Sequence, residues 1–321
     1  MLFSLVIPTY NRAQMVRSLL SSLEKVRIVK DTECEIVIVD NNSCDDTQDV
    51  VRDFKIKEPL RLRYFVEKKQ GSSHARNRGI REAKGGIIAF LDDDETVDSE
   101  WMVAVGEAFE RFQCVGVAGK VVPKWEFPCP DWYTQEGRYR IVGPTAGYNL
   151  GDAYKEYSME TLMPPTANLA VKREVFGKYG YFRTDKGPVG NQHDYSIGED
   201  TEFCLRLVKA GERLIYSPRA IVYNVVHEDR VTKAYCKRFH FRYGRMQAQL
   251  YPPKQGTRRY INVPPWLLKE YLRTLLLWGT FTGCGNKRAG LYYRLKLSRA
   301  YGQIYQHLVD RHRKTFYESA K

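Results

Sequence analysis

Short apolar runs alternate with amphipathic stretches over the first 120 residues of the chain. The apolar runs have the length of buried strands, and the stretches between them repeat apolar residues at helical spacing. This alternation predicts a mostly parallel, doubly wound α/β sheet of Rossmann-like type. The expected strands are Leu2–Ile7, Glu35–Val39, Leu62–Phe65 and Ile87–Leu91, and the expected helices are Ala13–Lys25, Asp45–Phe54 and Ser73–Lys84.

The pattern changes after residue 120. Residues 120–170 are irregular, aromatic and rich in proline and glycine, which predicts a long loop region for substrate binding or gating. Beyond residue 230 the pattern is helical. We therefore predict an α/β domain over 1–230 and a helical extension over 231–321. The later elements expected are a helix at Gly198–Gly211, strands at Arg213–Tyr216 and Ala220–Val226, and helices at Lys233–Leu250, Trp266–Phe281 and Ala289–Leu308.

The net charge of +13 is concentrated in the C-terminal extension. Residues 231–321 hold 19 lysines and arginines against three acidic residues, whereas residues 1–230 carry a net charge of −3. The seven cysteines are odd in number and lack Cys-x-x-Cys spacing, which favours reduced thiols over a disulfide framework or a zinc knuckle. No signal-peptide pattern is present, and no stretch reaches the roughly 20 apolar residues of a membrane span. These features predict a cytoplasmic protein.

Three polar clusters follow the expected strands, at Pro8–Asn11, Asp40–Ser43 and Asp92–Asp94. In doubly wound sheets ligands bind beyond the carboxyl ends of the strands. Asp92 and Asp94 share one side of the chain because side chains alternate along a strand, and such close carboxylates repel unless a cation or hydrogen-bond donors lie between them. Mg²⁺ and Mn²⁺ favour oxygen ligands and phosphate. The pattern predicts a cation and phosphate site, with a solvated acidic turn as the alternative.

Five segments in this order resemble the family 2 inverting glycosyltransferases with the GT-A fold, over about residues 1–230. The resemblance implies a metal-dependent enzyme that transfers a sugar, with inversion, from a nucleoside-diphosphate sugar to a hydroxyl acceptor. It favours a UDP-sugar donor and a role in polysaccharide or lipid-linked glycoconjugate biosynthesis. The segments are Val6–Arg12 (VIPTYNR), Ile38–Ser43 (IVDNNS), Gly71–Gly79 (GSSHARNRG), Phe90–Asp94 (FLDDD) and Gly198–Asp200 (GED).

The resemblance also implies roles for particular residues on the donor side. Asp94, with Asp92 and His227, is expected to bind Mn²⁺ or Mg²⁺, although a single histidine after a strand also fits a structural role. Asp40 is expected to accept a hydrogen bond from the base. The expected donor contacts are Pro8, Thr9, Tyr10, Asn11, Asp40, Arg76, Asn77, Asp92 and Asp93.

On the acceptor side, the resemblance places the catalytic base at Glu199-Asp200. We choose Asp200 as the base and expect Glu199 to orient the acceptor, while the reverse assignment and simple capping of the helix remain open. Asn168 and Trp125 are candidate acceptor contacts.

The sequence of the basic extension, residues 231–321, is compatible with more than one kind of binding partner. The Trp266–Phe281 segment is strongly apolar, is interrupted by Lys269 and Arg273, and is followed by further basic residues and tyrosines. Such a segment suits the surface of an anionic membrane and an acceptor carried on a polyprenyl diphosphate. Packing on the catalytic domain or on a second subunit is an equally weighted alternative. A nucleic-acid-binding tail is a rival for this region, but nothing in it matches a nucleic-acid-binding module, and we predict no nucleic-acid partner.

Two further functions compete with sugar transfer. A sugar nucleotidyltransferase also uses paired carboxylates and a metal on an α/β sheet, but it releases pyrophosphate. A noncatalytic sugar-binding protein is the third option, against which the intact Asp92, Asp94 and Asp200 argue. The transferred sugar, the acceptor, the linkage and the oligomeric state do not follow from the sequence.

Overall fold

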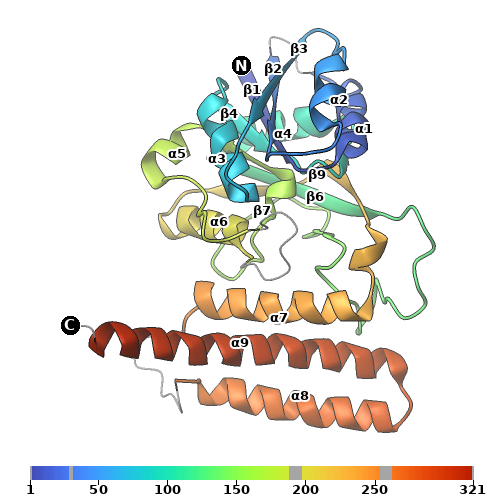
Figure 1. Cartoon of the computed structure of the whole chain (residues 1–321), viewed down its shortest axis with the longest axis vertical. Helices are drawn as coiled ribbons and strands as arrows, with labels where there is room; N and C mark the ends of the chain where they lie inside the picture. Colours follow the sequence, from blue (N-terminus) through green and yellow to red (C-terminus); the bar gives the residue numbers. More distant parts are fainter. Residues whose placement is uncertain (1, 29–31, 188–196, 254–261, 320–321) are drawn as a thin grey trace. The chain divides into compact units, whose positions relative to one another are not determined.

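The computed structural model describes residues 2–28, 32–187, 197–253 and 262–319, and its contacts divide the chain into two units (Figure 1). The α/β unit comprises residues 1–124 and 146–225, and the helical unit comprises residues 125–145 and 226–321. The sequence predicted a single boundary at residue 230, whereas the contacts also assign the 125–145 segment to the helical unit.

In the described part of the α/β unit, nine strands form one sheet in the order β3-β2-β1-β4-β8-β6-β9-β5, with β7 paired to β9. The first four are parallel, whereas β8 runs antiparallel to β4 and β6. The almost continuous apolar sequences of β1, β2 and β4 are buried, as parallel strands covered on both faces require, whereas the edge strand β3 is only partly buried. The strands are β1 (Leu2–Thr9), β2 (Glu33–Asp40), β3 (Leu60–Val66), β4 (Ile87–Phe90), β5 (Glu95–Val97), β6 (Gly116–Lys124), β7 (Lys155–Glu156), β8 (Leu169–Lys172) and β9 (Leu214–Val225).

The helices of this unit pack apolar faces on the sheet. In α1, Val16, Leu19, Leu20 and Leu23 are buried at the spacing of one helix face. Helix α3 approaches β1 so closely that a Cβ on Gly79 would lie 2.3 Å from Val6 Cγ1. The helices are α1 (Ala13–Leu23), α2 (Thr47–Asp53), α3 (Ser72–Glu82), α4 (Trp101–Phe112), α5 (Glu174–Tyr179) and α6 (Glu199–Lys209), with 3₁₀ turns at Thr166–Asn168 and Glu228–Arg230, the second in the helical unit.

The two strands expected at Arg213–Tyr216 and Ala220–Val226 form the single strand β9. Its pairing with β6 shifts register, so that Gly119 pairs with Ser217 but Lys120 pairs with Ile221. The shift accommodates the extra residues of β9, including Pro218, which has no N–H group to donate. One bulged strand therefore replaces the two that were predicted.

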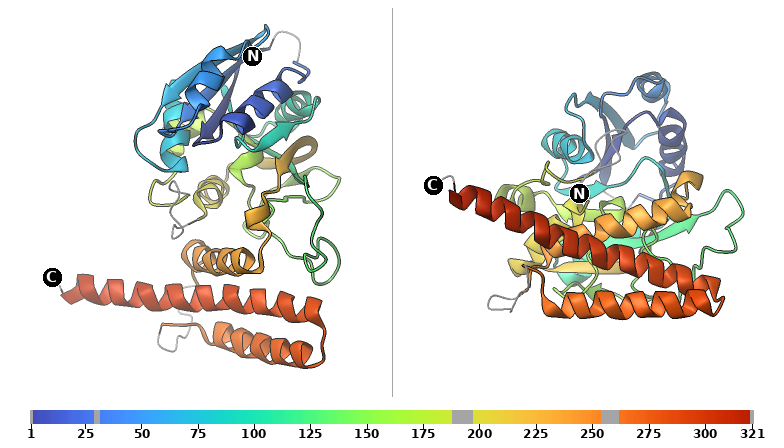
Figure 2. Two further views of the ribbon diagram at one scale, coloured as in Figure 1. Left: turned by 45° about the vertical axis from the view of Figure 1, so that its right-hand side comes forward. Right: turned by 60° about the horizontal axis from the view of Figure 1, so that its bottom comes forward.

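The helical unit contains α7 (Lys233–Leu250), α8 (Pro265–Gly283) and α9 (Lys287–Ser319), and α9 lies between the other two (Figures 1 and 2). Helices α7 and α9 pack so closely that a Cβ on Gly244 would lie 1.9 Å from the carbonyl oxygen of Arg299. The 125–145 segment joins this unit through an apolar cluster. Its buried members are Tyr133, Ile141, Val226, Val231, Cys236 and Leu295.

Candidate active site

An acidic rim follows the carboxyl end of β4. Asp92, Asp93 and Asp94 connect β4 to β5, which begins at Glu95. Asp93, Asp94 and Glu95 are buried, with Glu95 only 1% exposed, while a third of the Asp92 side chain remains accessible. The predicted carboxylate cluster therefore lies at the edge of the sheet where α/β proteins bind ligands.

Arg12 neutralises two carboxylates of this rim. Its Nη1 lies 2.7 Å from Asp93 Oδ1 and 3.0 Å from Asp94 Oδ2. Burial raises the pKa of Asp93 to about 6, and the nearby Arg12 offsets part of that rise. Burial disfavours the charged guanidinium, but Asp93 and Asp94 outweigh it and raise the pKa of Arg12. Sequence reasoning did not assign Arg12 to the site, although it ends the first motif.

Arg76 links the rim to the start of α6. Its Nη2 lies 3.0 Å from Asp92 Oδ1, and its Nη1 lies 3.0 Å from Glu199 Oε1. Arg76 is buried on α3, and its ion pair with the buried Glu199 is shielded from water, whereas a third of the Asp92 side chain stays accessible. The structure thus brings Asp92, Arg76 and Glu199 together. The predicted contact of Arg76 with the donor stays a prediction.

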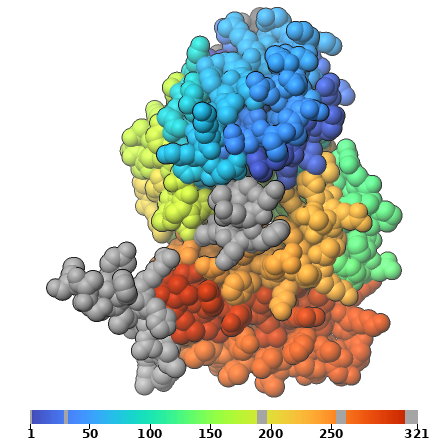
Figure 3. All heavy atoms as spheres, viewed as in Figure 1, coloured from blue at the N-terminus to red at the C-terminus, as the bar shows by residue number. Residues whose placement is uncertain are grey.

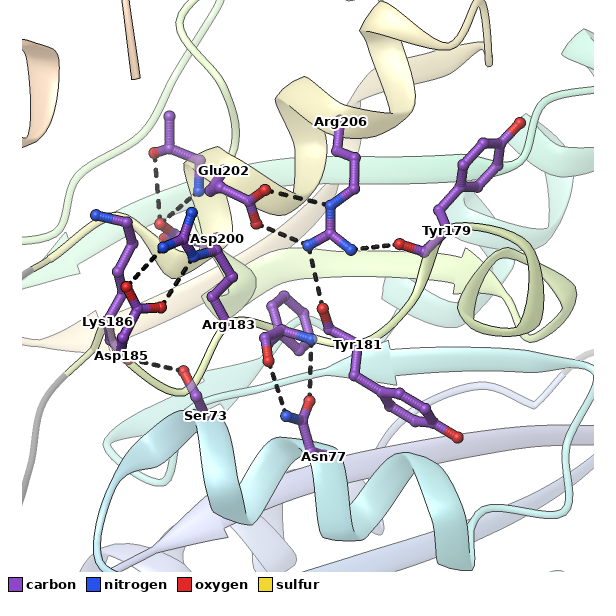
Figure 4. Close-up of polar contacts among 12 residues, drawn as sticks. Ser73, Asn77, Tyr179, Tyr181, Arg183, Asp185, Lys186, Asp200, Glu202 and Arg206 are labelled. Carbon is purple, nitrogen blue, oxygen red and sulfur yellow. Dashed lines mark hydrogen bonds and ion pairs between the residues drawn. The ribbon is translucent and has the colours of Figure 1, made fainter. Parts of the chain in front are cut away.

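Asp200 differs from its neighbour Glu199. Asp200 Oδ1 accepts a hydrogen bond from the backbone N–H of Thr201 (2.7 Å), and no ion pair joins it to a described cation (Figure 4). Burial and then repulsion from Glu199 raise the pKa of Asp200 to about 7. A carboxylate with this pKa suits proton abstraction near neutral pH. Glu199 is already paired with Arg76, and the role of Asp200 as the base stays a prediction.

Glu95 is a second rim residue that sequence reasoning missed. Its Oε2 accepts a hydrogen bond from the backbone N–H of Asp92 (2.9 Å). Burial, followed by repulsion from Asp92 and Asp94, raises the pKa of Glu95 well above its usual range. Asp94 Oδ1 in turn accepts from Asn224 Nδ2 on β9 (3.0 Å). These bonds fix the orientation of the loop that carries the aspartates.

The loops after β1 and β2 are joined by Asn11. The backbone N–H of Asn11 donates to Ser43 Oγ (2.8 Å), and its Oδ1 accepts from the N–H of Cys44 (2.8 Å). Asp40 is buried and accepts from the N–H of Ser43 (2.8 Å) and the hydroxyl of Tyr64. The structure thus joins two of the predicted donor-binding segments. Base recognition by Asp40, and the donor contacts of Pro8, Thr9, Tyr10 and Asn11, stay predictions.

Asn77 holds the 179–187 segment against α3 (Figure 4). Its Nδ2 donates to the carbonyl of Phe182 (2.8 Å), and its Oδ1 accepts from the N–H of Phe182 (3.0 Å). Ser73 Oγ on the same helix donates to the carbonyl of Lys186 (3.0 Å). The Asn77 amide is therefore committed to protein contacts here, and its predicted role at the donor stays a prediction.

Asn168 forms hydrogen bonds with backbone carbonyl groups at the point where the pairing of β6 and β9 shifts register. Its Nδ2 donates to the carbonyls of Lys120 (3.0 Å) and Ala220 (2.8 Å), and its Oδ1 accepts from Trp101 Nε1 (2.8 Å). The side chain is buried. This geometry favours a structural role, and the predicted acceptor contact of Asn168 stays a prediction.

His227 and Trp125 belong to the helical unit. His227 immediately precedes the 3₁₀ turn Glu228–Arg230, and Trp125 packs edge-to-face with Phe127 and Tyr133, at 5.5 Å between ring centroids in each case. Their predicted roles, as a metal ligand and an acceptor contact, stay predictions.

The donor set of the rim fits a hard divalent cation. Two arginines face a surplus of carboxyl groups on Asp92, Asp93, Asp94, Glu95, Glu199 and Asp200. In the described ranges, no three or more His, Cys, Asp or Glu side chains form a preformed metal cluster. Mg²⁺ commonly binds one or two carboxylates together with substrate phosphates and water. Asp92 and Asp94 therefore fit a cation that arrives with a diphosphate.

Comparison with known proteins adds to this geometry. A protein-family search matches the chain to "Glycosyl transferase family 2" over residues 4–179, more than half of its length. A glucosyl-dolichyl phosphate glucuronosyltransferase of Haloferax volcanii is 26% identical over 229 residues, which cover 71% of this chain and 70% of that protein.

Two solved structures share the fold. Mannosyltransferase PcManGT from Pyrobaculum calidifontis, in complex with GDP-Man and Mn²⁺, aligns with a TM-score of 0.61 and 18% identity, covering 94% of this chain and 86% of that one. TarS 1–349 of S. aureus, in complex with UDP-GlcNAc, aligns with a TM-score of 0.54 and 17% identity, covering 94% and 93%. The predicted α/β fold of GT-A type is confirmed, and this glycosyltransferase belongs to glycosyl transferase family 2.

Proposed function

We propose that this enzyme transfers a sugar, with inversion, from a nucleoside-diphosphate sugar to a hydroxyl group of a lipid-linked saccharide. The observation that carries this proposal is the pairing of two carboxylate sets through Arg76. Asp92 and Asp94 form a cation-binding set, and Asp200 offers a base with a pKa of about 7. A single displacement needs both a stabilised leaving group and a base on the acceptor side.

In the proposed reaction the acceptor oxygen forms a bond to the anomeric carbon as the bond from that carbon to the diphosphate oxygen breaks. Asp200 takes the proton of the acceptor hydroxyl, and the nucleoside diphosphate leaves with the electron pair. Arg12 and Arg76 hold the rim carboxylates in place. A Mn²⁺ or Mg²⁺ ion would be held by Asp92 and Asp94 and would supply Lewis-acid stabilisation of the leaving diphosphate.

Two considerations support the substrate classes. One similar structure is a complex with UDP-GlcNAc and the other is a complex with GDP-Man and Mn²⁺, and Asp40 at the end of β2 favours a uridine base. The Haloferax relative is named for a glucosyl-dolichyl phosphate, which supports a lipid-linked acceptor. We therefore place a UDP-sugar first among donors.

A lipid-linked acceptor calls for contact with a membrane surface. Across the part of the chain that is described, no helix combines the length and apolar character needed to cross a bilayer. Helix α8, which is orange in Figure 3, nevertheless exposes Leu276 (72%), Leu272 (58%) and Trp266 (55%), and its sequence also contains Lys269 and Arg273. We propose that this face binds the cytoplasmic surface of an anionic membrane. Burial against a second subunit is the competing explanation.

The test begins with thermal-shift measurements against UDP-, GDP- and dTDP-sugars, each with and without Mn²⁺. We expect a UDP-sugar to raise the melting temperature, and Mn²⁺ to enlarge the shift. Incubation of the stabilising donor with a lipid-linked oligosaccharide should then release a nucleoside diphosphate. Release of pyrophosphate, with formation of a nucleotide sugar from a sugar phosphate, would instead identify a nucleotidyltransferase.

A further inference from the structure

A cavity of about 710 Å³ lies within the helical unit at the turn between α8 and α9. Its walls come from the 125–145 segment, the start of α7, the end of α8 and the start of α9. The side chains that define its chemistry are Trp132, Lys233, Trp278, Lys287, Arg288 and Arg294. The cavity is therefore both aromatic and strongly basic.

The cations of this cavity lack carboxylate partners. Considering the described residues alone, Lys233, Lys287, Arg288 and Arg294 form no ion pair, whereas Lys296 on α9 lies 3.7 Å from Glu270. Lys233 Nζ instead lies 5.7 Å from the ring centroid of Trp132. The one acidic side chain lining the cavity, that of Asp131, leaves a net charge of +3. Grouped like charges repel, so an anion bound among them is stabilised.

The start of α9 adds a further attraction for anions. Asn286 caps this 33-residue helix, since its Oδ1 accepts from the N–H of Ala289 (3.0 Å). A Cβ on Gly290 would lie 3.0 Å from Thr282 Oγ1, so the end of α8 sits tightly against the first turn of α9. This turn brings the positive end of the helix dipole and two of the cations to one wall of the cavity.

An apolar row leads out of the cavity along α8. Trp278 lines the cavity, and Leu275 lies one turn earlier on the same helix face and is 38% exposed. Leu272 precedes it by a further three residues and is also exposed. The combination of a cationic cavity and an adjoining apolar row matches a ligand that has an anionic head and an apolar chain.

We propose that this cavity binds the phosphate or diphosphate group of the lipid-linked acceptor, with the first isoprenoid units along Trp278 and Leu275. The proposal rests on the proposed function, because it concerns the acceptor of that reaction. Lys287, Arg288 and Arg294 donate charge-assisted hydrogen bonds to the phosphate oxygens, and Trp278 packs against the lipid. The cavity thereby holds the lipid carrier through a group that is not consumed in the transfer.

The first experiment measures the binding of farnesyl diphosphate to the full-length protein by calorimetry, without divalent cations, so that the acidic rim does not contribute. The triple variant Lys287→Ala, Arg288→Ala, Arg294→Ala should weaken binding at least about tenfold. The charge-matched control Arg140→Ala, Lys237→Ala, Arg238→Ala removes exposed cations of the same unit outside the cavity and should bind normally. Equal losses in both triple variants, or no binding by the wild-type protein, would overturn the proposal.

A second pair of variants separates the cavity from the general membrane face. Trp278→Ala should weaken farnesyl diphosphate binding about fivefold and leave the weaker binding of inorganic diphosphate unchanged. Trp266→Ala, on the exposed face of α8, should weaken binding to phosphatidylglycerol vesicles but not to farnesyl diphosphate. If Trp266→Ala and Trp278→Ala weaken binding to farnesyl diphosphate and to the vesicles by the same factors, α8 binds membranes without a specific lipid site, and the proposal fails. A melting temperature equal to that of the wild-type protein shows that each variant is folded. Trp278→Phe, which keeps an aromatic ring, should bind farnesyl diphosphate normally.

A last measurement separates this proposal from the proposed function. The cavity triple variant should keep the wild-type thermal shift with nucleotide sugar and Mn²⁺, and should lose transfer to lipid-linked acceptor. If the wild-type protein binds farnesyl diphosphate but transfers no sugar, the proposed function fails and the cavity assignment stands. If it transfers sugar to the lipid-linked acceptor and the triple variant does so equally well, the cavity assignment fails.

Discussion

The acidic rim and the basic cavity use arginine in opposite ways. At the rim, Arg12 and Arg76 are enclosed by carboxylates, and each contacts two of them at 2.7–3.0 Å. In the cavity, Arg288 and Arg294 are exposed and have no carboxylate partner among the described residues. The enclosed arginines hold the rim carboxylates that we propose as the site of a cation with a diphosphate. The exposed arginines are available to an anionic ligand itself.

The largest effect is expected for a substitution of the proposed base, Asp200. Asp200→Asn should lower kcat by about 10²–10⁴-fold while nucleotide-sugar binding persists, because the amide keeps the shape but accepts no proton. Steady-state kinetics and the thermal shift with donor provide the two readouts. Loss of donor binding in this variant would indicate a structural role for Asp200 instead.

The next prediction compares the loss of folding stability on removal of an enclosed arginine with that on removal of an exposed one. Arg76→Ala leaves Asp92 and Glu199 without their buried partner, and should destabilise the fold by about 3–5 kcal/mol. Arg27→Ala breaks an exposed ion pair with Glu100 and should destabilise the fold far less, because water screens exposed ion pairs. Urea denaturation of both variants measures the difference. Similar losses would show that Arg76 contributes no more than a surface charge.

The pH dependence follows from the raised pKa of Asp200. Below about pH 7 the carboxyl group is protonated and cannot serve as a base, so kcat/KM should fall about tenfold per pH unit. Because the folded-state pKa exceeds that of an unfolded aspartate, about 4, the stabilisation from protonation is complete below pH 4 and is lost as the pH rises through 7. Asp200→Asn should therefore raise the melting temperature more at pH 8 than at pH 4. A flat pH profile of kcat/KM between 5 and 8 contradicts this assignment.

The smallest effect concerns salt. Raising NaCl from 0.05 to 0.5 M should weaken farnesyl diphosphate binding several-fold, because the cavity cations are exposed to screening. The free-energy difference between wild type and Arg76→Ala should change less over the same range, because Arg76 and Glu199 are buried and only Asp92 is partly accessible. A stronger salt effect at Arg76 than in the cavity would reverse the comparison.

The parts of the fold that the sequence predicted have strong periodicity. The helices expected at Ala13–Lys25 and Lys233–Leu250 are present with nearly the same bounds. Helix α4 was not among the helices whose bounds were predicted, although its exposed Glu107, Glu110 and Arg111 are spaced to share one helix face. The 125–145 segment has no period, and only its tertiary packing assigns it to the helices.

The candidate site was predictable only in part, for a similar reason. Asp92–Asp94 could be found because they follow an apolar strand directly. Arg12 and Glu95 are recognised as members of the rim only through contacts with residues elsewhere in the fold or through burial. The amide of Asn168 could not be assigned to the bulge, because the register shift in β9 depends on pairing between distant strands.

The shared guanidinium of Arg76 has a consequence for the order of events in catalysis. It is divided between Asp92, on the proposed donor side, and Glu199, next to the proposed base Asp200. A cation that engaged Asp92 would compete with Arg76 for that carboxylate and would strengthen the hold of Arg76 on Glu199. Occupancy by donor would then be communicated to the acceptor side, so we expect a compulsory sequence in which the nucleotide sugar binds first and the nucleoside diphosphate departs last.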